Sequence, residues 1–214
     1  MNFFGHAVSA CWSSDDPAFV LGAMLPDFAS MCRGKIASVG DERTAAGVDF
    51  HHRCDAVFHR APVFRELMSW LERALRDQNV RKGGSRGAAH VGIELLLDGA
   101  LIADPAARRL YPLALGHAGD ADVSWRDDAH AQRWSSLLVR LADHGLPVGY
   151  ADTAIVGKRI AQILSNRPLL ALTDAESVIV TETLSEASVK VRERADELCG
   201  FVAGQLGLTI RQQR

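Results

Sequence analysis

The sequence has few of the features that mark an exported, membrane-spanning or nucleic-acid-binding protein. Its four cysteines show no C-x-x-C spacing, so we expect reduced thiols and no zinc site built on cysteine. The longest apolar run near the start, residues 19–25, is far too short to cross a bilayer, and the first ten residues lack the positive segment of a signal peptide. Lys and Arg number 24 against 26 Asp and Glu, which argues against binding nucleic acid through a bulk positive field. We therefore predict a cytoplasmic protein with neither a membrane nor a nucleic acid as partner.

Proline and aromatic residues are also scarce. The 214 residues include 7 prolines, and aromatic residues make up 7%, whereas alanine and leucine are abundant, a balance that favours helices over a β-sandwich. Hydrophobic residues make up 48% and charged residues 23%, which excludes a disordered or low-complexity chain. No internal repeat or long linker is visible. We predict an all-α, single-domain helical bundle over residues 1–214.

Local signals divide this bundle into helices. Asp16 and Pro17 begin a helix that we expect to end or kink at Pro26, leaving Asp27 beside the break. Thr173 and Glu176 fit a capping box at the start of a long last helix. We expect that helix to end near Gly204 and Gly207. Further helices are predicted over residues 45–58, 62–78, 88–103, 125–143 and 150–165, and a short one from Asp104-Pro105 onward. Loops are predicted over residues 34–40 and 116–122, and a flexible basic loop over residues 81–87.

Two of the predicted helices carry side chains that can ligate a metal at four-residue spacing. Residues four apart lie on the same side of a helix, and both sets border an apolar face. Imidazole and carboxylate groups together suit a divalent transition metal such as manganese, iron or zinc. The alternative is that these are boundary residues that only make hydrogen bonds. The two sets are His51, Asp55 and His59, and His90, Glu94 and Asp98, with His6 and Asp27 as further candidates near chain breaks.

Other catalytic chemistries have no motif in the chain. The H-E-x-x-H, G-x-S-x-G, P-loop and G-x-G-x-x-G patterns are all absent. The glycine-rich residues 83–87 resemble a phosphate cradle only in composition. Cys54 lies on an apolar helix face, so we interpret it as a small core residue rather than a nucleophile. The four tryptophans, 12, 70, 125 and 134, are interpreted as core or groove aromatics.

Several segments, in order along nearly the whole chain, point to one family. They are MNFFGH at 1–6, GAMLPDF at 22–28, GVDFHHRCD at 47–55, and the late residues 159–160 and 165–168. In this order they resemble the MNFLAH, G-x-L-x-x-D-F, G-[IV]-x-x-H-R-x-I-D and R-x-x…RRP segments of the acyl carrier protein phosphodiesterase family. The resemblance implies an HD-domain-like helical fold and a manganese-assisted phosphodiesterase, with Fe2+ or Zn2+ as other possible ions. Such an enzyme acts in fatty acid metabolism, where it removes 4′-phosphopantetheine from holo-acyl carrier protein and leaves the apo form.

The resemblance also implies roles for individual residues. Asp27 and Asp55 would be catalytic, and Arg53, displaced by one position from the family's arginine, would bind the phosphate. The implied metal ligands are His6, Asp27, His51, Asp55, Glu94 and Asp98. The chain departs from the family pattern where it has His59 in place of an aspartate and Gly99 in place of a histidine. A neutral histidine can still ligate a metal.

Acyl carrier proteins are strongly acidic, so a carrier hydrolase needs local positive charge. The densest basic cluster in the sequence comprises Arg73, Arg76, Arg81, Lys82 and Arg86, and we predict that it binds the carrier. The alternative for these residues is a solvated charged face. Two alternatives to the predicted activity also stay open: a phosphohydrolase of HD type for a small phosphate ester or nucleotide, and a catalytically silent helical binding protein.

Overall fold

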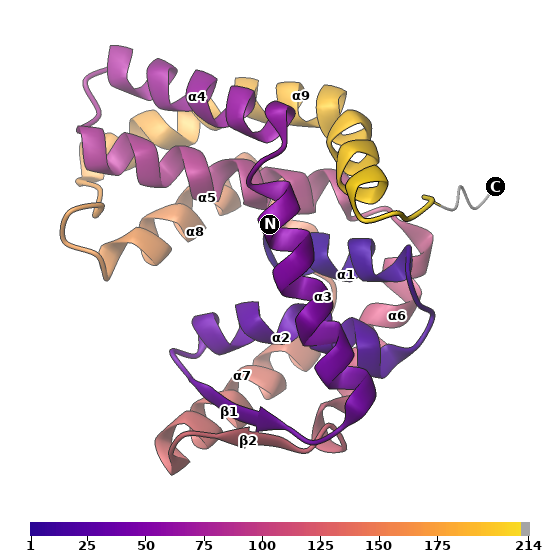
Figure 1. The fold of residues 1–214 in the computed structure, drawn as a ribbon. Coiled ribbons are helices and arrows are strands. Elements are labelled where there is room, and N and C mark those ends of the chain that lie inside the picture. The colour runs from indigo at the N-terminus through magenta and orange to yellow at the C-terminus, as the bar shows by residue number, and fades with distance from the viewer. Residues whose placement is uncertain (211–214) are drawn as a thin grey trace. The chain divides into compact units, whose positions relative to one another are not determined.

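The protein is described by a computed structural model over residues 1–210 (Figure 1). Helices account for 75% of the structure, so the predicted helical character is confirmed, whereas an HD-like arrangement stays a prediction. Within residues 1–210 no helix is both long and apolar enough to cross a membrane. The described chain forms two compact units, each assembled from separate stretches of sequence. The first unit comprises Met1–Val57, Ile102–Pro147 and the segment from Val202; the second comprises Phe58–Leu101 and Val148–Phe201.

The first unit is built around a buried N-terminal helix. All nine residues of α1 (Phe3–Cys11) are buried, because α1 packs against both α2 (Pro17–Met31) and α6 (Pro105–Gly116). Phe3, Phe28 and Tyr111 form the aromatic part of this core, with ring centroids of Phe3 and Phe28 5.4 Å apart. The unit also contains α3 (Glu42–Phe58) up to Val57, the 3-10 turn η1 (His117–Gly119) and α7 (Asp128–His144).

A small sheet in the first unit corrects the all-α prediction. Strand β1 (Ile36–Val39) pairs antiparallel with β2 (Val123–Trp125), where the sequence analysis expected a loop and the start of a helix. The strands have four and three residues, too few to show an alternating pattern, and each finds its partner more than 80 positions away in the chain. The indole ring of Trp125 lies beside Gly34, where a Cβ would come within 2.5 Å of the ring.

Helices α2 and α3 cross unusually closely in the first unit. A Cβ on Gly22 would lie 2.0 Å from the carbonyl oxygen of Thr44, and a Cβ on Gly47 would lie 2.2 Å from that of Phe19. Only glycine fits at these two positions, so the backbones of the helices touch there. The helix does not end at Pro26, as one form of the prediction had it, because α2 continues to Met31. A proline inside a helix removes one backbone hydrogen bond, and here the packing of α1 and α6 on α2 outweighs that loss.

The second unit contains α4 (Pro62–Asp77), α5 (Lys82–Leu101), α8 (Thr153–Ser165) and the main part of α9 (Asp174–Gln205), with the 3-10 turn η2 (Val148–Ala151). Figure 1 shows α4 and α5 running side by side, and α5 also packs against α8. The apolar stripe predicted for α4 is buried at Phe64, Leu67, Leu71 and Leu75.

The predicted flexible basic loop over residues 81–87 is wrong, because α5 begins at Lys82. The glycines of this segment serve close packing rather than flexibility. A Cβ on Gly83 would lie 2.0 Å from the carbonyl oxygen of Leu169, and one on Gly84 would lie 2.8 Å from the side chain of Leu172. The segment that leads into α9 therefore packs directly on the first turns of α5.

The ends of α9 agree with the sequence signals. Thr173 Oγ1 accepts a hydrogen bond from the Glu176 backbone N–H at 3.2 Å, and Glu176 Oε2 accepts one from the Thr173 N–H at 2.8 Å, which confirms the capping box. Gly207 adopts a φ of 68°, and the Leu208 N–H donates to the Ala203 carbonyl at 2.8 Å. This left-handed residue and its hydrogen bond end the helix in a Schellman motif.

Replacing a glycine at the crossing of α2 and α3 tests the importance of their close approach. We expect Gly47→Ala to lower the free energy of unfolding by roughly 1–3 kcal/mol, because the new Cβ meets backbone that can move only with its helix. Gly200→Ala is the matched control, since a Cβ there meets nothing within 4 Å inside α9, and it should stabilise the protein by roughly 0.5–1 kcal/mol. Urea unfolding of both variants measures these changes, and equal midpoints would contradict the assignment.

Candidate metal centre

Three side chains of the first unit bring ligand atoms together at one place. His6 of α1, Asp27 of α2 and His51 of α3 each place one ring nitrogen or carboxylate oxygen within 4.8 Å of the others. The imidazole centroids of His6 and His51 are 3.9 Å apart, and His6 Nε2 lies 3.9 Å from Asp27 Oδ2. Neighbouring ligands around an ion bound at about 2.1 Å are themselves separated by roughly 3–3.5 Å. The ligand atoms of this group are somewhat further apart than that, and close enough for the three side chains to hold one ion.

His6 is the most deeply buried member of this group. Its side chain is 0% exposed, and neither ring nitrogen has a hydrogen-bond partner among the described residues. Burial lowers the pKa of His6 to about 3, so the ring is neutral at pH 7 and carries a nitrogen lone pair. A buried polar group without a partner costs about 1–3 kcal/mol, and a bound ion would remove that cost. The side chain thus fits a metal ligand.

The backbone of α2 orients the imidazole of His51. His51 Nδ1 lies 2.8 Å from the carbonyl oxygen of Ala23, and because a carbonyl only accepts, Nδ1 carries the proton. This hydrogen bond leaves Nε2 with the lone pair, as in histidines that bind metals through a backbone-oriented ring. Burial lowers the pKa of His51 to about 4, so this ring is also neutral at pH 7. Asp27 follows Ala23 by one helical turn, which places both on the side of α2 that faces α3.

Asp55 lies next to this group. Its Oδ1 is 3.6 Å from His6 Nε2 and accepts a hydrogen bond from the α-amino group of Met1 at 3.0 Å. Its side chain is about one-third exposed. As predicted from their spacing, His51 and Asp55 lie one turn apart on α3, and Asp55 adds a second carboxylate beside His6, Asp27 and His51.

Arg53, Glu94 and Asp98, the other predicted site residues, are not members of the group of His6, Asp27 and His51. Arg53 is exposed on α3, two positions from His51 and from Asp55, and residues two apart do not share a helix face. Glu94 groups with His59 and His90 in the second unit, a second set of ligand atoms within 4.8 Å of one another. Asp98 is buried on α5, one turn after Glu94, and belongs to neither group. The departure at Gly99 has a packing reason, since a Cβ there would lie 2.1 Å from the carbonyl oxygen of Tyr150.

The residues predicted to bind a partner do not form one mobile cluster. Arg73 and Arg76 are exposed on α4, and Lys82 and Arg86 are exposed in the first turns of α5. Arg81 instead holds Glu176 through Nε and Nη2, each at 2.9 Å, and lowers the pKa of that carboxyl to about 2. Arg81 thus ties α5 to the capping box of α9.

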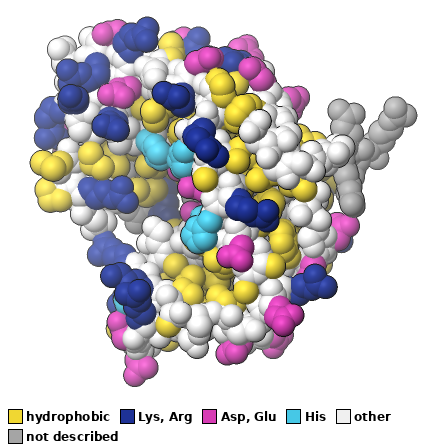
Figure 2. Space-filling model, in the orientation of Figure 1, with side chains coloured by type: hydrophobic (Ala, Val, Ile, Leu, Met, Phe, Trp, Pro, Cys, Tyr) yellow, Lys and Arg dark blue, Asp and Glu magenta, His cyan; other side chains and the backbone are white. Residues whose placement is uncertain are grey.

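The sequence analysis missed Arg65 on α4 and Arg60 in the turn before it. Arg60 and Arg65 join Arg73 and Trp70 in lining a groove of about 460 Å3. Figure 2 shows Lys and Arg side chains gathered over the part of the surface where α4 lies. Arg65 and Arg73 form no ion pair within residues 1–210. Arg65 and Arg73 are eight residues apart, a spacing that places them on one face of α4, opposite its apolar stripe.

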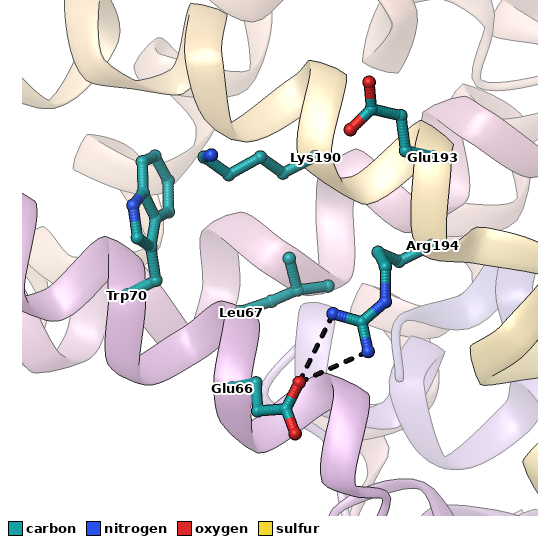
Figure 3. A pocket seen from close by; sticks show the side chains of 6 residues that line it. All are labelled: Glu66, Leu67, Trp70, Lys190, Glu193 and Arg194. Carbon is teal, nitrogen blue, oxygen red and sulfur yellow. Dashed lines mark hydrogen bonds and ion pairs between the residues drawn. The ribbon is translucent and has the colours of Figure 1, made fainter.

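In a neighbouring pocket of about 290 Å3 between α4 and α9, the side chains of Arg194 and Lys190 already contact other residues of the protein (Figure 3). Arg194 donates from both terminal nitrogens to Glu66 Oε2, at 3.2 and 3.3 Å. The ammonium nitrogen of Lys190 lies 4.8 Å above the centroid of the Trp70 ring. These contacts join α4 to α9, and they leave the adjacent groove as the stronger site for an anion.

The cysteines offer no nucleophile. All four are buried, and burial raises the pKa of Cys54 to about 11 and that of Cys11 to about 12. The thiols of Cys54 and Cys11 are therefore protonated at pH 7, in agreement with the interpretation of Cys54 as a core residue.

Comparison of the chain with models of protein families, with curated proteins and with solved structures finds no match.

The low pKa values of His6 and His51 predict acid sensitivity of the metal-free protein. An unfolded chain binds a proton at each imidazole below pH 6.5, whereas the folded protein does so only near pH 3 to 4. Stability should therefore fall as the pH falls from 6.5 towards 4, by up to about 1.4 kcal/mol per pH unit for each ring. Urea unfolding in chelator between pH 4.5 and 7 measures this slope. His6→Gln should have a shallower slope, and an unchanged slope would contradict the assignment.

Proposed function

We propose that this chain is a metal-dependent phosphodiesterase whose substrate is holo-acyl carrier protein, from which it releases 4′-phosphopantetheine. The observation that carries the proposal is the group of His6, Asp27 and His51, with the unpartnered ring nitrogens of His6 at its centre. The resemblance to the acyl carrier protein phosphodiesterase family supports the substrate. The same segments that carry this resemblance contain His6, Asp27, His51 and Asp55.

The ligand set favours a divalent ion of the manganese, iron and zinc series. Two neutral imidazoles and two carboxylates combine nitrogen and oxygen donors, and we propose Mn2+ as the ion held there. When bound, such an ion lowers the pKa of a coordinated water and screens the charge on phosphoryl oxygens.

The surrounding residues have separate tasks in this proposal. The Ala23 carbonyl keeps the proton of His51 on Nδ1, so that Nε2 faces the ion. Burial keeps His6 uncharged, so that no proton competes with the ion at its ring. Asp55 is partly exposed and lies 3.6 Å from His6, and its carboxylate can accept a proton from the attacking water. Arg53 is exposed on the same helix but on another face from His51 and Asp55, so in this proposal it has no contact with the phosphate at the ion.

The proposed partner-binding face lies on the second unit. An acyl carrier protein is acidic, and Arg65 and Arg73 of α4 line a groove beside Trp70 together with Arg60 of the preceding turn. Arg76 lies one turn further along α4. Arg65, Arg73 and Arg76 are exposed and form no ion pair within the described chain, so their charge is available to a partner. Lys82 and Arg86 add exposed charge on α5.

Asp27→Asn tests the catalytic centre. We expect hydrolysis of holo-carrier protein in Mn2+ to fall at least about 100-fold, because the variant loses an anionic ligand, while far-ultraviolet circular dichroism stays unchanged. Mass spectrometry of the carrier measures the loss of the phosphopantetheine group. Asp49→Asn is the matched control, since Asp49 is an exposed carboxylate on α3 outside both ligand groups. Full activity of Asp27→Asn would remove Asp27 from the mechanism.

Charge reversal on α4 tests the partner face. Arg73→Glu with Arg76→Glu should lower kcat/KM for the carrier protein by about tenfold or more at low salt, with little change for a small phosphodiester. The control with the same change in net charge is Arg108→Glu with Arg140→Glu, both exposed in the first unit. Arg81 is unsuitable here, because its reversal would break the ion pair with Glu176. Equal losses on both substrates would show that α4 does not recognise the carrier.

A further inference from the structure

A second group of metal-type side chains lies entirely within the second unit. His59 follows the end of α3, and His90 and Glu94 lie one turn apart on α5. One carboxylate oxygen, Glu94 Oε1, lies 3.2 Å from His90 Nε2 and 3.6 Å from His59 Nε2. All three ligand atoms are within 4.8 Å of one another.

Aromatic packing holds the two imidazoles in parallel. Their centroids are 4.9 Å apart with an angle of 18° between the ring planes. The buried ring of Phe64 stands edge-on to both, with its centroid 5.2 Å from that of His59 and 5.6 Å from that of His90. Phe58, also fully buried, supports Phe64 at 4.4 Å. Both rings are thus fixed with their Nε2 atoms directed at the same carboxylate oxygen.

Glu94 Oε1 is within hydrogen-bond distance of His90 Nε2 and slightly further from His59 Nε2. The separation of 3.6 Å between His59 Nε2 and Glu94 Oε1 exceeds the length of an N–H···O hydrogen bond. Both distances are also close to the edge of a coordination polyhedron, since two ligands each about 2.1 Å from one ion are roughly 3–3.5 Å apart.

The donor set and its exposure indicate the kind of ion. Two imidazoles and one carboxylate are the protein ligands of open zinc sites, in which water or an anionic oxygen takes the remaining position. The side chains are 32% exposed at His59, 43% at His90 and 15% at Glu94, so such a position would face solvent. Two imidazoles and a single carboxylate make a nitrogen-rich set, which suits zinc better than manganese.

We propose that His59, His90 and Glu94 form a second metal centre, with its own ligand set in the second unit, that binds Zn2+ and leaves a position open to an anionic oxygen ligand. The proposal goes beyond the proposed function and does not depend on it. His59, where the chain departs from the family pattern, is in this view a change of ligand rather than the loss of one.

The experiment titrates the chelator-stripped full-length protein with Zn2+ by calorimetry and with Co2+ by visible absorption. We expect His90→Gln and His59→Gln each to bind one Zn2+ ion fewer per chain, or that ion at least about 100-fold more weakly, and to lose one Co2+ absorption band. His144→Gln is the matched control, because His144 is exposed on α7 outside both groups. Asp27→Asn should retain the ion that depends on His90.

The outcomes separate the two proposals. Unchanged Zn2+ stoichiometry and affinity in both His90→Gln and His59→Gln, with the fold intact by circular dichroism, would overturn the second centre. Because both imidazoles are partly exposed, we expect both variants to fold. Loss of the ion from these variants, together with no hydrolysis by the wild-type protein, would uphold the second centre and overturn only the phosphodiesterase.

Discussion

The close approach of α2 and α3 at Gly22 and Gly47 is the constraint on which the first ligand group depends. With two Cβ atoms in that crossing the backbones would have to separate, and the Ala23 carbonyl would leave His51. That one hydrogen bond fixes the ring, its proton and the direction of its lone pair. Asp27, one turn after Ala23, reaches the same place because α2 runs on through Pro26. Two small residues and one uninterrupted helix thus decide where a carboxylate and an imidazole meet.

The titratable side chains of the protein differ in whether their polar atoms find partners. Around His6 and His51 burial lowers the pKa values and keeps the rings neutral, which reduces the stability of the empty site but prepares it for a cation. At Glu176 the guanidinium of Arg81 and the backbone of Thr173 compensate the carboxylate, so the charge stabilises the start of α9. The first arrangement is unsatisfied and suits a ligand, whereas the second is satisfied and structural. This contrast separates a candidate site from a helix cap.

The surface of the second unit shows the same distinction between engaged and available charge. Arg194 and Lys190 are held by Glu66 and the Trp70 ring, so they join α4 to α9. Arg65 and Arg73, on the outer side of α4, have no such partners in the described chain. The sequence does not distinguish these basic residues, although only Arg65 and Arg73 have charge that a partner could bind.

Composition and periodicity alone determined the helical character, the buried stripe of α4 and the capping box of α9, because each depends on residues within a few turns of one another. They also paired His51 with Asp55 through their spacing on one helix. Tertiary structure alone decided the rest. The strands β1 and β2 are too short to show a strand pattern in the sequence. The first glycine of α5 serves packing against Leu169, a residue distant along the chain. The meeting of His6 with Asp27, and of His59 with His90, joins side chains that are 21 and 31 positions apart in the sequence. No local rule predicts such contacts, because they follow from how whole helices pack.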